Sequence, residues 1–226
     1  MIRTLVIALS IAYPLLAHAA VALDSLALTV LALALLAVAM LVPSLQQGSV
    51  VGWLTLAAVG AGCGWLVQNG STLLPLYLPP VLFPAFLAWV FGHTLAQGRT
   101  PLIAQLIRLL HASGPPPEPD VWLYARRLTL AWTVFFAALA AVNLLLAAIT
   151  APGGLLLEAH ITPPLTVTPE AWSLFANVIG NVLAAVFFAV EYAYRRRRFP
   201  QQPYRNMLDF LRQMAVASTR LFERGR

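Results

Sequence analysis

A long apolar segment that runs into four consecutive arginines constrains the fold of this chain more than any other stretch. It covers residues 171–200, AWSLFANVIGNVLAAVFFAVEYAYRRRRFP. A helix that crosses a bilayer needs about 20 apolar residues, and the apolar part of this segment is long enough. Arginines beside a span stay on the cytoplasmic side of the membrane. The segment therefore predicts a transmembrane helix over residues 171–194 and also its direction.

The rest of the chain is apolar to a similar degree. Hydrophobic residues make up 60% of it, charged residues make up 10%, and the mean hydropathy is +0.80. A water-soluble domain could not cover so much apolar surface. With 226 residues there is room for about six spans of roughly 20 residues each. We expect an all-α, polytopic membrane helix bundle over residues 1–200. The predicted spans are residues 4–20, 26–42, 50–67, 73–91, 128–150 and 171–194.

The first apolar run has two interpretations. Residues 17–19 read AHA, which resembles the cleavage site of a signal peptide. The other interpretation is an uncleaved helix over residues 4–20. We favour the uncleaved helix because a second apolar run follows almost at once, after a turn at Asp24 and Ser25. The topology is the same under either interpretation.

The fourth span carries four prolines, Pro75, Pro79, Pro80 and Pro84. Each proline removes a backbone donor and crowds the preceding turn. We therefore expect an extended start and a kinked helix from about Pro80, and leave open whether the span is continuous. Broken helices line the substrate sites of many transporters, whereas an irregular outer end of an ordinary helix is the simpler interpretation.

Two amphipathic helices are predicted at the membrane surface. The first follows Thr100 and Pro101, which suit a helix N-cap and the first helical position, and it covers residues 102–110. A stiff, proline-rich linker over residues 112–120 comes next. The second helix is the basic tail, residues 201–226, with apolar residues at three- and four-residue steps.

The arginines predict the orientation of the bundle. The chain has fourteen arginines and no lysine. With six spans, all of them fall on one side: Arg3, four in residues 92–127 and nine after the last span. By the positive-inside rule both termini are cytoplasmic, which suits a bacterial inner membrane. The basic charge then indicates anionic lipid rather than nucleic acid as a partner.

Polar residues recur along the sixth span. Ser173, Asn177 and Asn181 are four residues apart, and Glu191 continues the same helical face. Intramembrane polar groups face the bundle interior or a water-filled cavity. The asparagines could form interhelical hydrogen bonds, which we favour, or could line a path for a polar or amphiphilic molecule. Glu191 is also placed to pair with Arg195 one turn later.

No catalytic or metal-binding pattern stands out. The single cysteine, Cys63, excludes an intrachain disulfide and lies in an apolar run beside the GxxxG pair Gly60 and Gly64, which suits close helix packing. Glu158 and His160 are a weak metal pair because no third ligand is evident. We therefore predict a protein that is not an enzyme, with no metal and no cofactor.

Three stretches carry a family resemblance: residues 91–103 (FGHTLAQGRTPLI), residues 124–136 (YARRLTLAWTVFF), and WSLFANV with EYAYRRRRFP in residues 172–200. They resemble bacterial inner-membrane proteins found beside fatty-acid-synthase-like genes for aryl polyene pigments or related lipids. The match covers the C-terminal two thirds of the chain. That family has no established catalytic residues, so the resemblance implies none. Some members are labelled ketosynthase, but Cys63 in a membrane helix argues against the soluble ketosynthase fold.

Two functions are expected from these observations. The first is a non-catalytic accessory or scaffold protein of lipid or aryl-polyene-type biosynthesis, which docks acyl carrier protein or soluble enzymes. The arginines expected to contact the partner or anionic lipid are Arg126, Arg127, Arg195, Arg196, Arg197 and Arg198. The alternative is a transporter or flippase for a lipid-like product, using the fourth span and the polar residues of the sixth. The sequence names no ligand and no oligomeric state.

Overall fold

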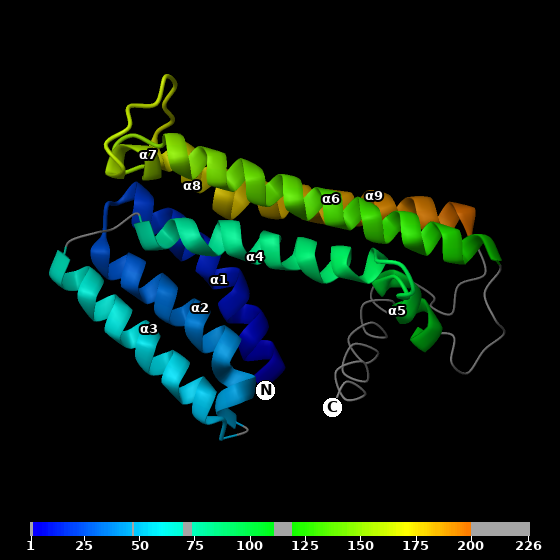
Figure 1. Ribbon diagram of the computed structural model, residues 1–226. Coiled ribbons are helices and arrows are strands. Elements are labelled where there is room, and N and C mark those ends of the chain that lie inside the picture. The colour runs from blue at the N-terminus through cyan, green and yellow to red at the C-terminus, as the bar shows by residue number, and fades with distance from the viewer. Residues whose placement is uncertain (1, 47, 70–73, 111–118, 200–226) are drawn as a thin grey trace. The chain divides into compact units, whose positions relative to one another are not determined.

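The structure is a computed structural model that describes residues 2–46, 48–69, 74–110 and 119–199 (Figure 1). This part of the chain is helical and contains no β-strand, which confirms the all-α class. The elements are α1 (Ile2–Ala22), α2 (Leu26–Gln46), α3 (Val50–Asn69), α4 (Leu74–Gly92), the 3-10 turn η1 (His93–Leu95), α5 (Leu102–Leu110), α6 (Pro119–Ile149), α7 (Leu155–Glu158), α8 (Pro169–Leu174), the π-helical turn η2 (Phe175–Ile179) and α9 (Gly180–Arg198). The predicted tail helix, and most of the linker before α6, lie outside the described residues.

Three helical segments are long and apolar enough to cross a membrane, judged by length and composition. They are Leu74–Leu95, Pro119–Ile149 and Pro169–Arg198. These segments overlap the predicted fourth, fifth and sixth spans almost completely. Shorter apolar stretches, Ala12–Ala22, Leu26–Val42 and Val50–Trp65, occupy α1, α2 and α3.

The predicted extended start of the fourth span is wrong, because α4 is helical from Leu74. Pro75 lies in the first turn, where a missing N–H costs no intrahelical hydrogen bond. Leu76 and Tyr77 are buried, and the Tyr77 hydroxyl donates to the Gly153 carbonyl at 3.1 Å. Most helix stability comes from tertiary packing of this kind, and it outweighs the local cost of the prolines.

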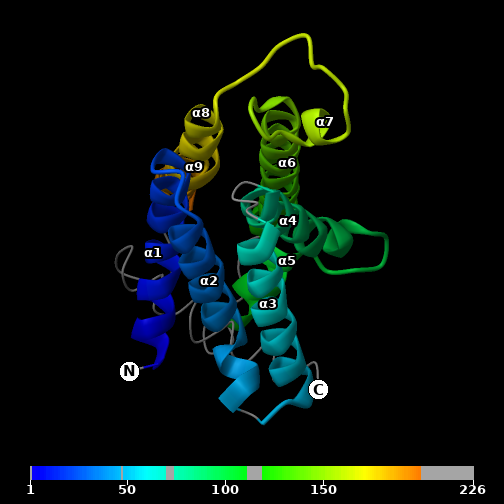
Figure 2. The same cartoon turned by 90° about the vertical axis from the view of Figure 1, so that its left-hand side faces the viewer.

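The chain divides into two compact units. Unit 1 comprises Met1–Leu82 and Ala140–Val182, and unit 2 comprises Phe83–Leu139 and Leu183–Arg226. In unit 1, α1 and α2 form a hairpin through the turn at Asp24, and α3 packs against α2 (Figure 2). The other side of α1 contacts α8 and η2.

The core of unit 1 is built around Trp172, which is 1% exposed. Its ring meets the ring of Tyr77 edge to face, with centroids 4.5 Å apart. Small side chains from three other helices complete the cluster; among them are Ala17, Ala32 and Ala147. Small residues let helix backbones approach closely, as in membrane bundles.

In unit 2, aromatic side chains join α6 to α9 and to α4. The Phe187 ring lies 4.6 Å from that of Trp132 and 5.0 Å from that of Phe135. Phe91 of α4 also contacts Trp132. Nearby, a Cβ at Gly92 would lie 3.1 Å from a methyl carbon of Thr133, so the end of α4 approaches α6 closely.

Helix α5 packs on α6 in the same unit. Ala104 and Ile107 are buried with Ala125, so part of the face that we assigned to the membrane surface contacts protein. At its N-terminus, Leu102 N–H donates to the Thr94 hydroxyl at 3.0 Å, and Ile103 N–H donates to Thr129 at 3.3 Å. Hydroxyls from outside α5 therefore satisfy two of the first donors of this helix.

Candidate functional site

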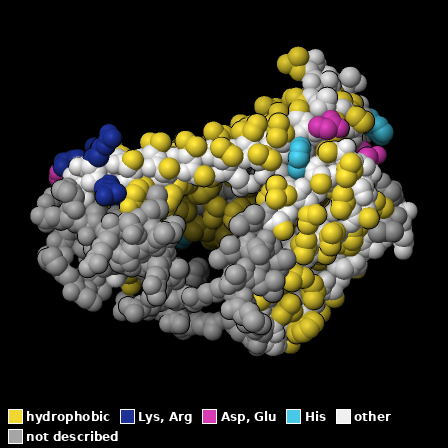
Figure 3. Space-filling view, turned by 180° about the vertical axis from the view of Figure 1, so that it is seen from behind, with side chains coloured by type: hydrophobic (Ala, Val, Ile, Leu, Met, Phe, Trp, Pro, Cys, Tyr) yellow, Lys and Arg dark blue, Asp and Glu magenta, His cyan; other side chains and the backbone are white. Residues whose placement is uncertain are grey.

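Arginine side chains gather in unit 2 where α6 begins and α9 ends (Figure 3). Arg126 and Arg127 project from α6, and the last turn of α9 is Arg195, Arg196, Arg197 and Arg198. All of these except Arg195 are exposed. We call these six residues the arginine face. Basic residues in the last turn also complement the negative end of the α9 dipole.

Glu191 binds Arg195 of the arginine face and links it to α6. Its carboxylate lies 2.9 Å from Arg195 Nε and accepts a 2.8 Å hydrogen bond from the Tyr124 hydroxyl of α6. The two side chains of the ion pair are only 8% and 11% exposed, glutamate first. The predicted pairing of Glu191 with Arg195 is confirmed. The tyrosine was not foreseen, since its contact depends on how α6 packs against α9.

A second ion pair lies at the end of α9 and joins Arg198 to Asp120. Arg198 Nη2 lies 3.1 Å from Asp120 Oδ2, which links the last turn of α9 to the first turn of α6. Both side chains are more than half exposed, so this pair contributes little to stability. Its consequence is electrostatic, because it neutralises the carboxylate of Asp120.

The arginine face carries a surplus of positive charge. The described residues of unit 2 include eight arginines and two carboxylates, Asp120 and Glu191. Arginines already bind both carboxylates. Within the described part of the chain, no carboxylate pairs with Arg127, Arg196 or Arg197. Their exposed guanidinium groups can bind anions from outside, and the guanidinium fork suits carboxylate and phosphate.

Unit 1 holds a different polar cluster, made by Ser173, Asn177 and His18. Asn177 Nδ2 donates to both the hydroxyl and the carbonyl oxygen of Ser173, each at 3.2 Å. The Ser173 hydroxyl is also 3.1 Å from His18 Nδ1, on α1. Since Oγ accepts from Asn177, its own proton is available for the histidine nitrogen. The cluster therefore ties α8 and η2 to α1.

Asn181 takes a different position from the other two. Ser173 and Asn177 are buried, whereas Asn181 is exposed and donates to the Asn177 carbonyl at 2.8 Å. The π-helical turn between them, η2, widens the helix and changes which face later residues present. Four-residue spacing therefore did not keep these three side chains on one buried face. Glu191, the fourth member of the predicted polar line, belongs to unit 2.

His18 is a residue that we did not assign to the site from sequence. The available signal was an ionisable side chain within an apolar run, which by default suggests function or a specific partner. Its partner, Ser173, lies 155 residues away in sequence. No local spacing could have joined the two.

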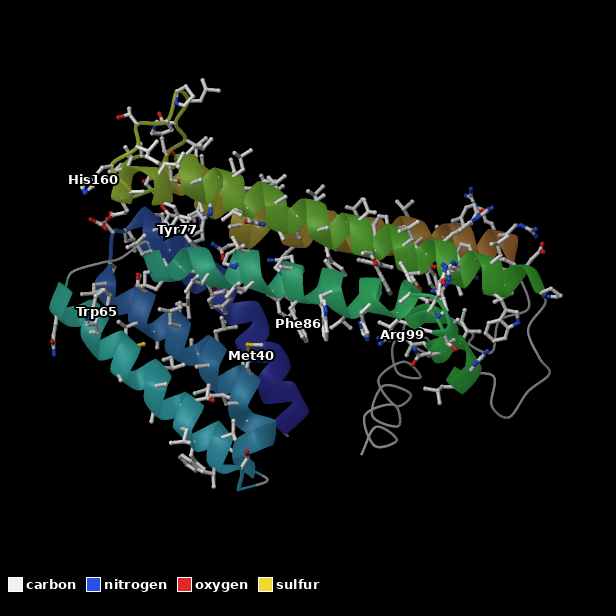
Figure 4. The ribbon with its side chains drawn as sticks, in the orientation of Figure 1. Met40, Trp65, Tyr77, Phe86, Arg99 and His160 are labelled. Atoms are coloured by element: carbon white, nitrogen blue, oxygen red, sulfur yellow. The ribbon has the colours of Figure 1, made fainter. Side chains whose placement is uncertain are left out.

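The remaining reactive groups stay apart. Cys63 is a free cysteine, and no three histidine, cysteine, aspartate or glutamate side chains cluster within the described residues. Glu158 and His160 are exposed on the segment between α6 and α8, and Figure 4 labels His160 there.

Comparison with protein-family models, with curated proteins and with solved structures finds no match. The fold and the site therefore define a class only: a helical protein with membrane-compatible helices and an arginine-rich face.

Proposed function

We propose that the chain is a six-span protein of a bacterial inner membrane whose arginine face docks an acidic soluble partner at the cytoplasmic surface. The observation that carries the proposal is the set of exposed arginines without carboxylate partners, at the end of two helices long and apolar enough to span a bilayer. The proposed role is that of a non-catalytic accessory protein.

The surfaces of α1, α2 and α3 support the six-span arrangement. Large apolar side chains are exposed on each of them: Leu15 on α1, Leu31 and Met40 on α2, and Trp53 and Leu54 on α3. Contiguous apolar surface of this kind needs lipid or protein to cover it. The described loops at residues 23–25 and 150–168 contain no arginine, as outer loops should.

Cysteine labelling tests this topology. In a Cys63→Ala background, Leu165→Cys should react with a membrane-impermeant maleimide in intact spheroplasts, because Leu165 is 75% exposed on the proposed outer loop. Arg99→Cys, on the proposed inner side, should react only after the membrane is permeabilised. The reverse pattern would overturn the orientation, and labelling of both in intact spheroplasts would exclude an inner position for residue 99.

Acyl carrier protein is the partner that we propose, since it is acidic and the family resemblance places such proteins beside biosynthetic genes of this kind. Complementary charge accelerates encounter and suppresses wrong partners. Arg195 and Arg198 are engaged in ion pairs within unit 2, and Arg126 donates to the Leu95 carbonyl at 3.3 Å. The partner would therefore contact Arg196 and Arg197 first.

The docking test keeps the internal ion pairs intact. We expect Arg196→Gln with Arg197→Gln to weaken carrier-protein binding by roughly tenfold, because exposed charge pairs contribute up to about 1 kcal/mol each. Binding is measured by pull-down with purified carrier protein at low and at physiological salt. The control is Arg99→Gln with Arg108→Gln, which removes the same charge elsewhere in unit 2. Equal binding by the two double variants would contradict the proposal.

A transporter for an amphiphilic product is the alternative, and one observation favours it. The π-helical turn η2 carries Asn177 of the buried polar cluster of unit 1, and π-helical turns often mark functional sites. The hydrogen bonds of that cluster join its members to one another, which suits packing equally well. Carrier-protein binding that survives the loss of Arg196 and Arg197 would shift the preference to transport.

A further inference from the structure

A groove lies between α6 and α9 beside the arginine face. Its volume is about 490 Å³, and all of its lining belongs to unit 2. Ligand sites in proteins typically measure roughly 300–1,000 Å³. The groove is therefore large enough for one small ligand or one chain of a lipid.

The groove changes character along its length. The two helices run antiparallel, since Asp120 pairs with Arg198 at one end and Trp132 contacts Phe187 at the other. The lining at the first end includes the charged side chains of Asp120 and Arg198, and Arg127 lies two turns further along α6, directly before Leu128. The lining at the other end is apolar, from Leu128, Ala131, Phe187 and Val190.

Two tyrosines lie between the Asp120–Arg198 pair and the apolar lining, and Arg127 lies just under one turn beyond Tyr124 on α6. The rings of Tyr124 and Tyr194 stack with centroids 5.9 Å apart, and both line the groove. Tyrosine prefers the level of lipid headgroups, where its ring is apolar and its hydroxyl is wet. The groove thus combines a charged mouth, an interfacial aromatic pair and an apolar trough.

The net charge of the lining selects an anion. The lining contains two carboxylates, but Asp120 is bound by Arg198 and Glu191 by Arg195. Arg127 is exposed and has no carboxylate partner among the described residues, so it leaves one positive charge in the groove, next to the start of the apolar lining. One phosphate diester carries the matching negative charge, and an arginine fork can bind two of its oxygens.

We propose that this groove binds one anionic phospholipid, with the headgroup phosphate at Arg127 and an acyl chain along Leu128, Ala131, Phe187 and Val190. The inference rests on the proposed membrane location but not on carrier-protein docking. A bound lipid would fill the apolar trough and place a phosphate among the arginines, which are otherwise mutually repulsive.

Native mass spectrometry of the detergent-purified protein tests the site with three probes. Phosphatidylglycerol should give a one-to-one adduct that survives dilution. Phosphatidylcholine, which has the same chains without net charge, and glycerophosphoglycerol, which has the same phosphodiester charge without chains, should bind at least about tenfold more weakly. Equal binding of the two lipids would overturn the anion selectivity. Equal binding of glycerophosphoglycerol and phosphatidylglycerol would overturn the role of the acyl chain.

Two variants locate the lipid. Ala131→Trp fills the apolar trough and should abolish the phosphatidylglycerol adduct, whereas Ala138→Trp, on an exposed position of the same helix outside the lining, should leave it. Arg127→Gln should weaken the adduct about tenfold, by loss of a charge-assisted contact, whereas Arg99→Gln should not. An adduct that persists in both Ala131→Trp and Arg127→Gln overturns the proposal.

These outcomes are independent of the docking test. Neither Arg127 nor Ala131 is changed in the double variants used for carrier protein. Loss of lipid selectivity with intact carrier-protein binding would contradict only the proposed lipid site. Intact lipid selectivity without carrier-protein binding would contradict only the proposed docking role.

Discussion

Trp172→Ala should lower the free energy of unfolding by about 3–5 kcal/mol, the usual cost of truncating a fully buried tryptophan. Trp172 is 1% exposed and fills the centre of unit 1, where it contacts the ring of Tyr77. The small side chains around it cannot expand to fill the space that the indole leaves. The free energy of unfolding is measured by titrating sodium dodecyl sulfate into the protein in a mild detergent.

Two companion variants make the Trp172 prediction specific. Trp53→Ala, at a residue 57% exposed on α3, should change stability by no more than about 0.5 kcal/mol. Trp172→Phe should cost much less than alanine, because the indole N–H has no acceptor among the described residues and the ring packing is largely kept. Similar losses for Trp53→Ala and Trp172→Ala would contradict the described core.

Glu191→Leu should destabilise unit 2 by about 2–3 kcal/mol. The substitution removes the carboxylate beside the largely buried Arg195 guanidinium and the acceptor of the Tyr124 hydroxyl. Removing one partner of a fully buried ion pair costs roughly 3–5 kcal/mol. We expect less here because Arg195 is still 11% exposed. The same detergent unfolding assay measures the loss.

A double-variant cycle separates the ion pair from its surroundings. Glu191→Leu with Arg195→Met should recover most of the stability, because an apolar pair replaces two partly buried charges together. The control is Asp120→Asn, which breaks the exposed pair with Arg198 and should cost under about 1 kcal/mol. Failure of Arg195→Met to recover stability would indicate that the Tyr124 hydrogen bond, rather than the charge, dominates.

Features within a single helix could be predicted from the sequence. The apolar lengths of the last three spans and the all-α class needed only composition and run length. Glu191 and Arg195 are four residues apart, and a helix brings such residues together whatever surrounds it. The extended start predicted from the prolines of α4 was wrong, because packing of Leu76 and Tyr77 outweighs the cost of the prolines to the helix.

Features between helices could not be predicted in this way. The Ser173–Asn177–Asn181 spacing assumed a regular helix, and the π-helical turn changed which of the three is buried. The contact of His18 with Ser173 and that of Tyr124 with Glu191 join residues 155 and 67 positions apart. Nothing in their local sequence specifies such partners.

The sequence by itself therefore determined that this is a helical chain with membrane-compatible segments, and it placed an arginine-rich stretch directly after the last of them. These properties follow from hydrophobicity and from the 3.6-residue period of one helix. Only the tertiary structure decided which arginines are neutralised, which polar side chains are buried together, and that a groove with a charged mouth lies between α6 and α9. Those depend on which helix faces meet, and side-chain packing between distant segments sets that.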